Sequence, residues 1–333
     1  MTTFVHSTVT ANEDAPYYWL ATGDDLIVTS TGALFATDDA PVFLGSGNTV
    51  RVDGGIYADN GGSAIFEIPG DGGHLIQVGS SGVVQSRNEG ILLTVGGSRI
   101  ENEGEISAAK AVSAPSVDLV NGGLISGSLI GIEVSGAAAS HIVNSGTIRG
   151  PVAIEAGPGA DVVENAGLIM GDVNLDEGAD RYDGRLGTLT TWVSGGAGRD
   201  TLLGGGLGDD LRGGDDKDRL LGGGGDDTLW GGKGSDAVTG GAGDDLLSGG
   251  SKADVFQFAA GFGHDVISDF AATGVRHDVL QFSRTVFENF AQVSAASDQV
   301  GADVVIRTAG GDDIVLRGVS VGDLDATDFG FVA

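Results

Sequence analysis

The chain has 333 residues, of which 61 are glycine, against 13 phenylalanines, 4 tyrosines and 3 tryptophans. So few bulky side chains argue against an ordinary globular core. The formal net charge of −30 opposes compaction unless cations bind, and it disfavours nucleic acid and anionic membranes as partners. Because there is no cysteine, no disulfide can supply stability, and a bound metal is the remaining means of crosslinking.

The first residues, MTTFVHSTVTANEDAPYYW, contain neither a basic segment nor an uninterrupted apolar segment. No later stretch reaches the roughly 18 apolar residues that a membrane-spanning helix needs. We therefore expect neither a Sec signal peptide nor insertion into a membrane.

A loose motif, apolar-x-N-x-G-x-apolar, recurs between residues 28 and 169. Its period of about 22 residues fits one turn of a wide solenoid with three short strands. We therefore predict a parallel β-helix over residues 1–194, with β-sandwich strands as the alternative. The pattern is similar to the right-handed β-helices of bacterial surface and autotransporter passenger proteins. The glycines that set the period are Gly32, Gly54, Gly82, Gly104, Gly123, Gly146 and Gly167.

Four asparagines occupy one phase of this longer repeat. In a stack of coils they would lie above one another at one corner, where each side-chain amide can bond to the next. A β-sandwich predicts no such fixed phase. The four are Asn102, Asn121, Asn144 and Asn165.

Residues 195–257 divide without a gap into seven nonapeptides: GGAGRDTLL, GGGLGDDLR, GGDDKDRLL, GGGGDDTLW, GGKGSDAVT, GGAGDDLLS and GGSKADVFQ. The two leading glycines permit positive φ, so a tight turn can direct its carbonyl oxygens inward. The aspartate at position six adds a hard, charged oxygen of the kind that Ca²⁺ prefers. The apolar residue at position eight would point into the coil, so two nonapeptides make one coil. A flexible Gly/Asp-rich linker is the alternative, but composition alone does not fix an apolar residue to one phase.

These units resemble the RTX (repeats-in-toxin, haemolysin-type) repeats of secreted calcium-binding proteins. The resemblance implies a right-handed parallel β-roll with several Ca²⁺ ions between successive turns. Leu207 and Asp216 stand at position four, where the family has glycine, and we expect their turns to bind more weakly or not at all. We expect two columns of ions. Asp200, Asp218, Asp236 and Asp254 would serve one edge, Asp209, Asp227 and Asp245 the other, together with the leading glycines Gly195, Gly204, Gly213, Gly222, Gly231, Gly240 and Gly249.

Two aspartates upstream of the nonapeptides stand in a similar setting. Asp161 in GPGADVV and Asp180 in DEGADRY precede Asp200 at intervals close to those within the roll. On one interpretation the calcium column begins at these residues, and on the other they are solvated corner residues. The sequence leaves both open.

Residues 258–333 are expected to form a small β-rich cap. A short helix is predicted around 286–295, followed by strands at DVVIR and DIVLR, while Phe256, Phe258 and Phe270 would close the end of the solenoid. The segment resembles the C-terminal cap of RTX proteins, which implies export by a type I secretion apparatus from a Gram-negative bacterium. By the same resemblance, Asp265 and Asp269 would bind a last Ca²⁺.

The sequence shows no catalytic motif. It contains neither H-E-x-x-H nor G-x-S-x-G, and its five histidines, His6, His74, His141, His264 and His277, are scattered and read as turn or surface residues. We therefore expect a non-enzymatic extracellular protein of a surface layer, matrix or adhesin, with self-assembly or a cell-surface polysaccharide as partner. The alternative is a module that binds polysaccharide or acts on it as a lyase or epimerase, which would need a base and cations on one face.

Overall fold

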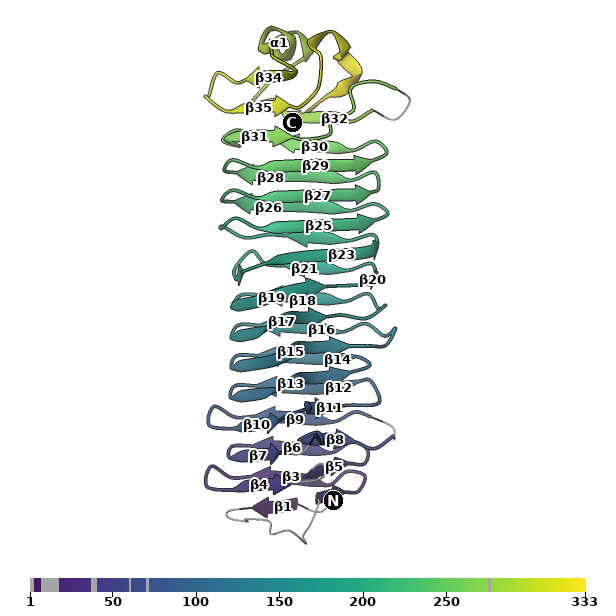
Figure 1. Ribbon diagram of the computed structural model, residues 1–333, viewed down its shortest axis with the longest axis vertical. Helices are drawn as coiled ribbons and strands as arrows, with labels where there is room; N and C mark the ends of the chain where they lie inside the picture. The colour runs from purple at the N-terminus through teal and green to yellow at the C-terminus, as the bar shows by residue number, and fades with distance from the viewer. Residues whose placement is uncertain (1–2, 7–17, 37–40, 60, 70–71, 275–276) are drawn as a thin grey trace. The chain divides into compact units, whose positions relative to one another are not determined.

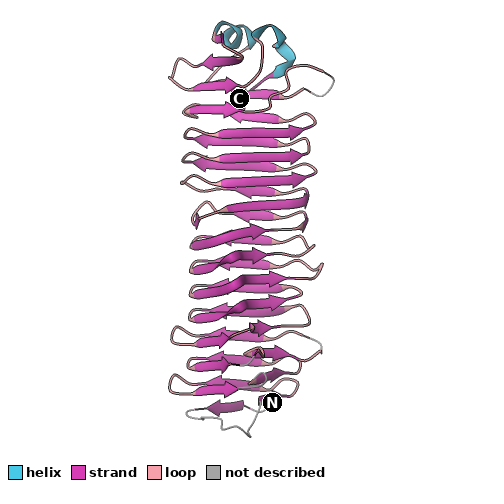
Figure 2. Ribbon diagram, in the orientation of Figure 1, coloured by secondary structure: helices cyan, strands magenta, loops and turns pink. Residues whose placement is uncertain are grey.

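The computed structural model describes residues 3–6, 18–36, 41–59, 61–69, 72–274 and 277–333. Contacts divide the chain into two compact units. The N-terminal unit comprises Met1–Glu177 and Gly187–Thr190, and the C-terminal unit comprises Gly178–Leu186 and Thr191–Ala333. Almost every regular element in the described residues is a β-strand (Figure 2), which confirms the all-β prediction.

In the N-terminal unit, parallel strands stack on one another (Figure 1), and their pairings form three columns. The first column holds β1 (Thr3–His6), β3 (Asp25–Val28), β6 (Thr49–Val52), β9 (Leu75–Val78), β12 (Ser98–Asn102), β14 (Val117–Asn121), β16 (His141–Asn144) and β18 (Val162–Asn165). The second holds β4 (Ala33–Ala36), β7 (Gly55–Ala58), β10 (Val83–Ser86), β13 (Glu105–Ala114), β15 (Leu124–Val134), β17 (Thr147–Glu155), β19 (Leu168–Asn174) and β22 (Thr188–Leu189). The third holds β2 (Tyr18–Leu20), β5 (Val42–Leu44), β8 (Ile65–Glu67) and β11 (Glu89–Leu92), and it continues into the second half of β13.

The predicted asparagine ladder is present in this unit. The Nδ2 of Asn102 donates to Oδ1 of Asn121 at 2.7 Å, and the same bond links Asn121 to Asn144 and Asn144 to Asn165 at 2.8 Å. All four side chains are buried. The ladder and the parallel register confirm the β-helix, and the β-sandwich alternative is wrong.

The glycines of the longer repeat are required where coils touch. A Cβ added at Gly123 would lie 2.2 Å from the carbonyl oxygen of Gly104, and one at Gly146 would lie 2.2 Å from that of Gly123. Since no real Cβ approaches an oxygen so closely, a side chain here would force neighbouring coils apart. The glycine period therefore reflects the close stacking of backbones.

In the C-terminal unit the strands form two parallel stacks. One holds β21 (Arg181–Asp183), β24 (Thr201–Leu203), β26 (Arg219–Gly224), β28 (Ala237–Ala242), β30 (Val255–Phe258), β32 (Val279–Ser283) and β36 (Phe329–Val332). The other holds β23 (Trp192–Gly198), β25 (Asp210–Asp215), β27 (Thr228–Lys233), β29 (Leu246–Ser251), β31 (His264–Ile267) and β35 (Asp313–Leu316), while β20 (Glu177–Gly178) spans the boundary of the two units.

The eighth residue of each nonapeptide forms the core of this roll. Neighbouring strands pair 18 residues apart, as Arg219 with Ala237 and Thr228 with Leu246. Two nonapeptides therefore make one coil, as predicted. The side chains at position eight are all fully buried: Leu202, Leu211, Leu220, Leu229, Val238, Leu247 and Phe256.

The cap follows the roll. Strands β33 (Ser297–Val300), β34 (Asp303–Arg307) and β35 pair antiparallel, and two short 3-10 helices (Val321–Asp323 and Ala326–Asp328) precede β36. Helix α1 (Phe290–Ala295) begins later than expected, because the Asn289 side chain accepts the Gln292 N–H and caps it. The predicted aromatic closure is present, since Phe256 packs on Phe270 and Phe258 packs on Phe262.

Candidate metal centre

The aspartates at position six form a ladder along one edge of the roll, here named edge 1 and made of residues 195–200, 213–218, 231–236 and 249–254. The backbone N–H of Asp200 donates to Oδ1 of Asp218 at 2.8 Å, and Asp218 and Asp236 repeat this bond to the aspartate one coil further on. Each carboxylate thus fixes the turn of the preceding coil through one oxygen. Its second oxygen, Oδ2, is left over.

The opposite edge, named edge 2, comprises residues 204–209, 222–227, 240–245 and 260–265. Here the N–H of Asp209 donates to Asp227, that of Asp227 to Asp245, and that of Asp245 to Asp265, at 2.7 to 3.0 Å. Asp265 therefore continues this column into the cap. The aspartates of the seven nonapeptides fall on the two edges in the grouping that the sequence predicts.

The remaining carboxylate oxygens are buried and lack a hydrogen-bond partner. Apart from Asp209, the nonapeptide aspartates and Asp265 are no more than 2% exposed, and their Oδ2 atoms have no donor within the described residues. A buried carboxylate without a counter-charge is expensive. Burial accordingly raises the pKa of Asp218 and Asp265 to about 8 and that of Asp227 and Asp254 to about 7. A hard cation would satisfy these oxygens in their ionised form.

The leading glycine of each nonapeptide makes room beside that oxygen. A Cβ added at Gly222 or Gly240 would lie 2.0 Å from the Oδ2 of Asp227 or Asp245, and one added at the leading glycine of the other five units would lie 2.3 to 2.7 Å from the Oδ2 of its own aspartate. The second glycine has positive φ in most units, for example 118° at Gly214 and 123° at Gly241. The turn therefore leaves a space beside each Oδ2 atom, here called the glycine cradle, that only glycine permits. The oxygens around this space are ligands of the kind that Ca²⁺ prefers.

The side chains alone do not complete such a site. Nowhere in the part of the chain that the structure describes do three acidic or histidine side chains converge on one point. Ca²⁺ prefers six to eight oxygens, so backbone carbonyls of the glycine turns would have to supply the rest. The nonapeptide pattern predicts this combination of side-chain and backbone ligands.

The two turns that depart from the pattern differ in structure. Leu207 is 60% exposed, and in its turn the Gly205 N–H donates to Asp209 Oδ2 at 2.7 Å, so this oxygen is already engaged. In the other turn Asp216 adopts φ of 73°, in the region that glycine normally occupies, and the turn keeps its shape. Lys252 does the same at φ 89° and is a third departure, which the sequence analysis missed.

The cap aspartates have separate roles. Asp269 is exposed and accepts the Ser248 hydroxyl and the N–H groups of Gly249 and Gly250, so it completes the last coil through hydrogen bonds. Asp278, which sequence reasoning missed, continues edge 1, because its Oδ1 accepts the Asp254 N–H at 2.9 Å. The signal was available in RHDVLQF, where an aspartate again precedes an apolar strand, but the spacing of 24 residues hid it.

The two upstream aspartates are both buried, at 1% and 2% exposure, and are not solvated corner residues. In the C-terminal unit the Asp180 N–H donates to Asp200 Oδ1 at 2.8 Å, so Asp180 stands in line with edge 1. In the N-terminal unit Asp161 accepts the Ser140 N–H, and burial raises the pKa of Asp161. Metal binding by either residue remains a prediction.

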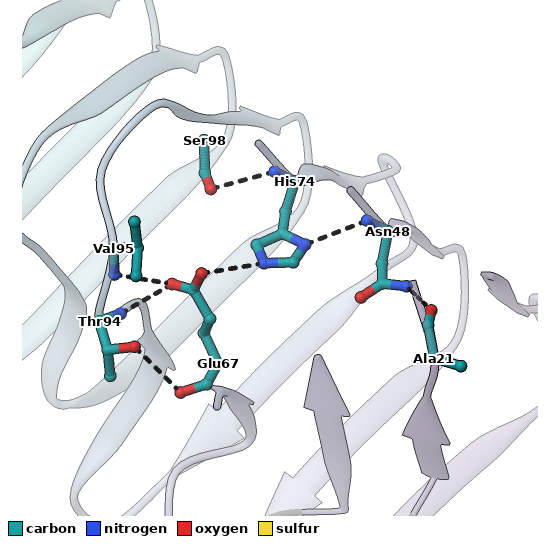
Figure 3. Close-up of polar contacts among 7 residues, drawn as sticks. All are labelled: Ala21, Asn48, Glu67, His74, Thr94, Val95 and Ser98. Carbon is teal, nitrogen blue, oxygen red and sulfur yellow. Dashed lines mark hydrogen bonds and ion pairs between the residues drawn. The ribbon is translucent and has the colours of Figure 1, made fainter. Parts of the chain in front are cut away.

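His74 is buried, contrary to the expectation of turn or surface positions. His74 Nδ1 accepts the Asn48 N–H at 3.1 Å, so the ring proton is on Nε2 and faces Glu67 Oε1 at 3.1 Å (Figure 3). The other Glu67 oxygen accepts the N–H groups of Thr94 and Val95. The hydrogen-bonding groups of this network are paired with one another. The network therefore links coils of the N-terminal unit, and its role is structural.

A match to a known repeat family agrees with this geometry. Four overlapping segments, residues 191–211, 203–238, 212–247 and 239–268, match the RTX calcium-binding nonapeptide repeat. Among solved structures, the extracellular lipase LipA from Serratia marcescens is similar at 16% sequence identity and a TM-score of 0.25. That alignment covers 60% of this chain and 41% of the lipase chain. None of the curated protein sequences matches the chain.

Proposed function

We propose, from the premise that residues 191–268 are RTX calcium-binding repeats, that the protein is a secreted structural component of a cell surface, folded by several Ca²⁺ ions. The observation that supports it is the two ladders of buried aspartates, whose unpartnered oxygens lie in glycine cradles. In this proposal Asp200, Asp218, Asp236 and Asp254 on edge 1 and Asp227, Asp245 and Asp265 on edge 2 contribute ligands. A protein built almost entirely of stacked coils suits a surface layer, matrix or adhesin.

The export route is part of the proposal. No helix among the described residues is long and apolar enough to cross a membrane. The cap and its resemblance to RTX proteins support passage through a type I apparatus to the outside of a Gram-negative cell. Low cytosolic Ca²⁺ would keep the roll unfolded until export, since extracellular modules bind Ca²⁺ at about 10⁻⁴ to 10⁻³ M.

The structural role is tested by imaging the full chain by negative-stain electron microscopy in millimolar Ca²⁺ and in chelator. We expect filaments, sheets or cell-surface coats that form with Ca²⁺ and disperse without it. Sedimentation in the same buffers measures the shift from monomer to assembly. Particles that stay monomeric in Ca²⁺ and leave intact cells uncoated would contradict the structural role, without touching the prediction that the roll binds calcium.

A second candidate function, binding of polysaccharide or action on it, is favoured by two surfaces of the N-terminal unit. Arg99, Asp118 and His141 occupy matching positions on β12, β14 and β16 and line a hollow of about 350 Å³. The sequence analysis missed this cluster because its members lie 19 and 23 residues apart. Arg99 already bonds Glu101 and Asp118, so little positive charge remains to neutralise a substrate carboxylate.

The other surface of the N-terminal unit favours binding over cleavage. Phe35, 45% exposed, stacks on Tyr57 with ring centroids 4.8 Å apart, and both line a hollow of about 470 Å³ with Gln85 and the ion pair of Arg87 and Asp59. Exposed aromatic faces with adjacent polar groups suit the apolar face of a neutral sugar ring.

Affinity electrophoresis through neutral polysaccharides separates these possibilities. We expect retardation of the wild-type chain that F35A/Y57A abolishes and H141A retains, with no shortened polysaccharide in either case. Polysaccharide shortened by wild-type protein and not by H141A would instead establish an enzyme at the Arg99–Asp118–His141 surface. Unretarded migration of all three would remove the second candidate function.

A further inference from the structure

The two edges of the roll differ in the residue that precedes each buried aspartate. On edge 2, Asp226 and Asp244 occupy position five, and they form a second carboxylate ladder outside the first. Asp226 Oδ1 accepts the Asp244 N–H at 3.0 Å, and Asp244 Oδ1 accepts the His264 N–H at 3.1 Å. On edge 1 the same position holds Arg199, Lys217, Ser235 and Ala253.

The remaining turn positions increase this difference. Beyond the aspartates at position six, the edge 1 turns carry two carboxylates, Asp215 and Asp216, and four cations, Arg199, Lys217, Lys233 and Lys252. The edge 2 turns carry Asp226 and Asp244 and no lysine or arginine, with His264 as their other titratable side chain. At the cap end both edges gain carboxylates. Asp312 accepts the Gly261 N–H at 3.0 Å on edge 2, while Asp278 accepts the Asp254 N–H and Asp269 those of Gly249 and Gly250 on edge 1, so the edge 1 turns keep the four cations that edge 2 lacks.

These charges lie beside the candidate ligands. Lys217 directly precedes Asp218 on edge 1, whereas Asp226 and Asp244 directly precede Asp227 and Asp245 on edge 2. Lys and Arg near a site repel a divalent cation, whereas extra carboxylates attract it. Salt screens such charges only weakly within the Debye length of about 10 Å at 0.1 M.

We propose that the two edges are two classes of calcium site, and that edge 2, at Asp227, Asp245 and Asp265, fills at lower free Ca²⁺ than edge 1. The inference rests on the proposed calcium binding of the roll. It implies an intermediate state in which one edge is ordered by metal before the other. The Leu207 turn lies outside the tight class, because Asp209 Oδ2 is already held by Gly205.

Isothermal titration calorimetry of the full chain with Ca²⁺ tests this. At low ionic strength we expect two classes of site whose dissociation constants differ by about tenfold or more. D226S/D244S should weaken the tight class about tenfold and leave the weak class in place, whereas R199S/K217S should tighten the weak class. Serine is the matched replacement, because Ser235 occupies position five in this roll. D323S, in the exposed 3-10 helix of the cap, is the control and should change neither class.

Raising the salt to about 1 M, where the Debye length falls to about 3 Å, should bring the two classes together. One uniform class at low salt, or a tight class that D226S/D244S leaves unchanged, overturns the inference while the proposed calcium binding stands. Absence of any Ca²⁺ binding by the wild-type chain overturns both.

Discussion

Removal of Ca²⁺ is expected to unfold the roll of the C-terminal unit. Apart from the first, which also buries Leu203, each nonapeptide buries a single large apolar side chain, so little else offsets the loss of chain entropy on folding nine residues. Without metal, folding of the ladders on both edges either brings ionised carboxylates out of water and close to one another or requires them to take up protons. Binding converts this repulsion to attraction, and each tenfold rise in free Ca²⁺ above the dissociation constant should add about 1.4 kcal/mol per bound ion.

Thermal melting followed by circular dichroism at a series of free Ca²⁺ concentrations measures this effect. The transition assigned to the roll should rise steadily with Ca²⁺ and disappear in chelator. Mg²⁺ is the matched control, because it demands a smaller octahedral shell and keeps its water, so it should not restore the transition. A melting temperature that ignores Ca²⁺ would make the metal incidental.

An N121L substitution is expected to destabilise the N-terminal unit by about 3–5 kcal/mol. Asn121 is fully buried; its Oδ1 accepts from Asn102, and its Nδ2 donates to Asn144. Leucine would fill similar space but would leave the Oδ1 of Asn144 and one Nδ2 hydrogen of Asn102 unpaired, and each unsatisfied buried group costs about 1–3 kcal/mol.

Urea unfolding of the full chain in saturating Ca²⁺ measures this change as a shift in the midpoint of the N-terminal transition. The exposed Asn88 lies in the same unit outside the ladder, and N88L should change stability by no more than about 0.5 kcal/mol. An N121L loss below about 1 kcal/mol would show that the ladder is dispensable.

The sequence predicted those features that repeat at one phase. Aspartate at position six, an apolar residue at position eight and the asparagine ladder each recur once per coil or half-coil, so stacking follows directly from the period. The same reasoning placed the position-six aspartates on two edges. In the nonapeptides the strict period of nine residues determines which residues of successive coils pair with each other.

Features that depend on coils of unequal length were not predictable in this way. Asp278 joins edge 1 after an interval of 24 residues, and Arg99, Asp118 and His141 meet only because β12, β14 and β16 pair in register. The bond between His74 and Glu67 likewise depends on how one irregular corner folds. In each case the length of a local loop determines which residues meet, and the repeat pattern does not contain that length.

The resemblance to RTX caps assigned Asp269 to metal binding, which stays a prediction, and in the structure its oxygens accept from Gly249, Gly250 and Ser248. The position of Asp269 in the cap motif did not show that the N–H groups of Gly249 and Gly250 would need an acceptor. The outer ladder of Asp226 and Asp244 was visible as an aspartate doublet in two nonapeptides, but only the hydrogen bonds between coils show that it forms a column.

The central claim, that Ca²⁺ is the folding switch of the roll, is tested most directly by hydrogen exchange on the full chain with and without Ca²⁺. In Ca²⁺, the amides of the buried residues Leu220, Leu229 and Val238 should exchange slowly. In chelator they should exchange at the rate of an unfolded chain, while those of Leu119 and Ile142 in the N-terminal unit stay protected. Equal protection of the roll in both buffers would contradict the claim.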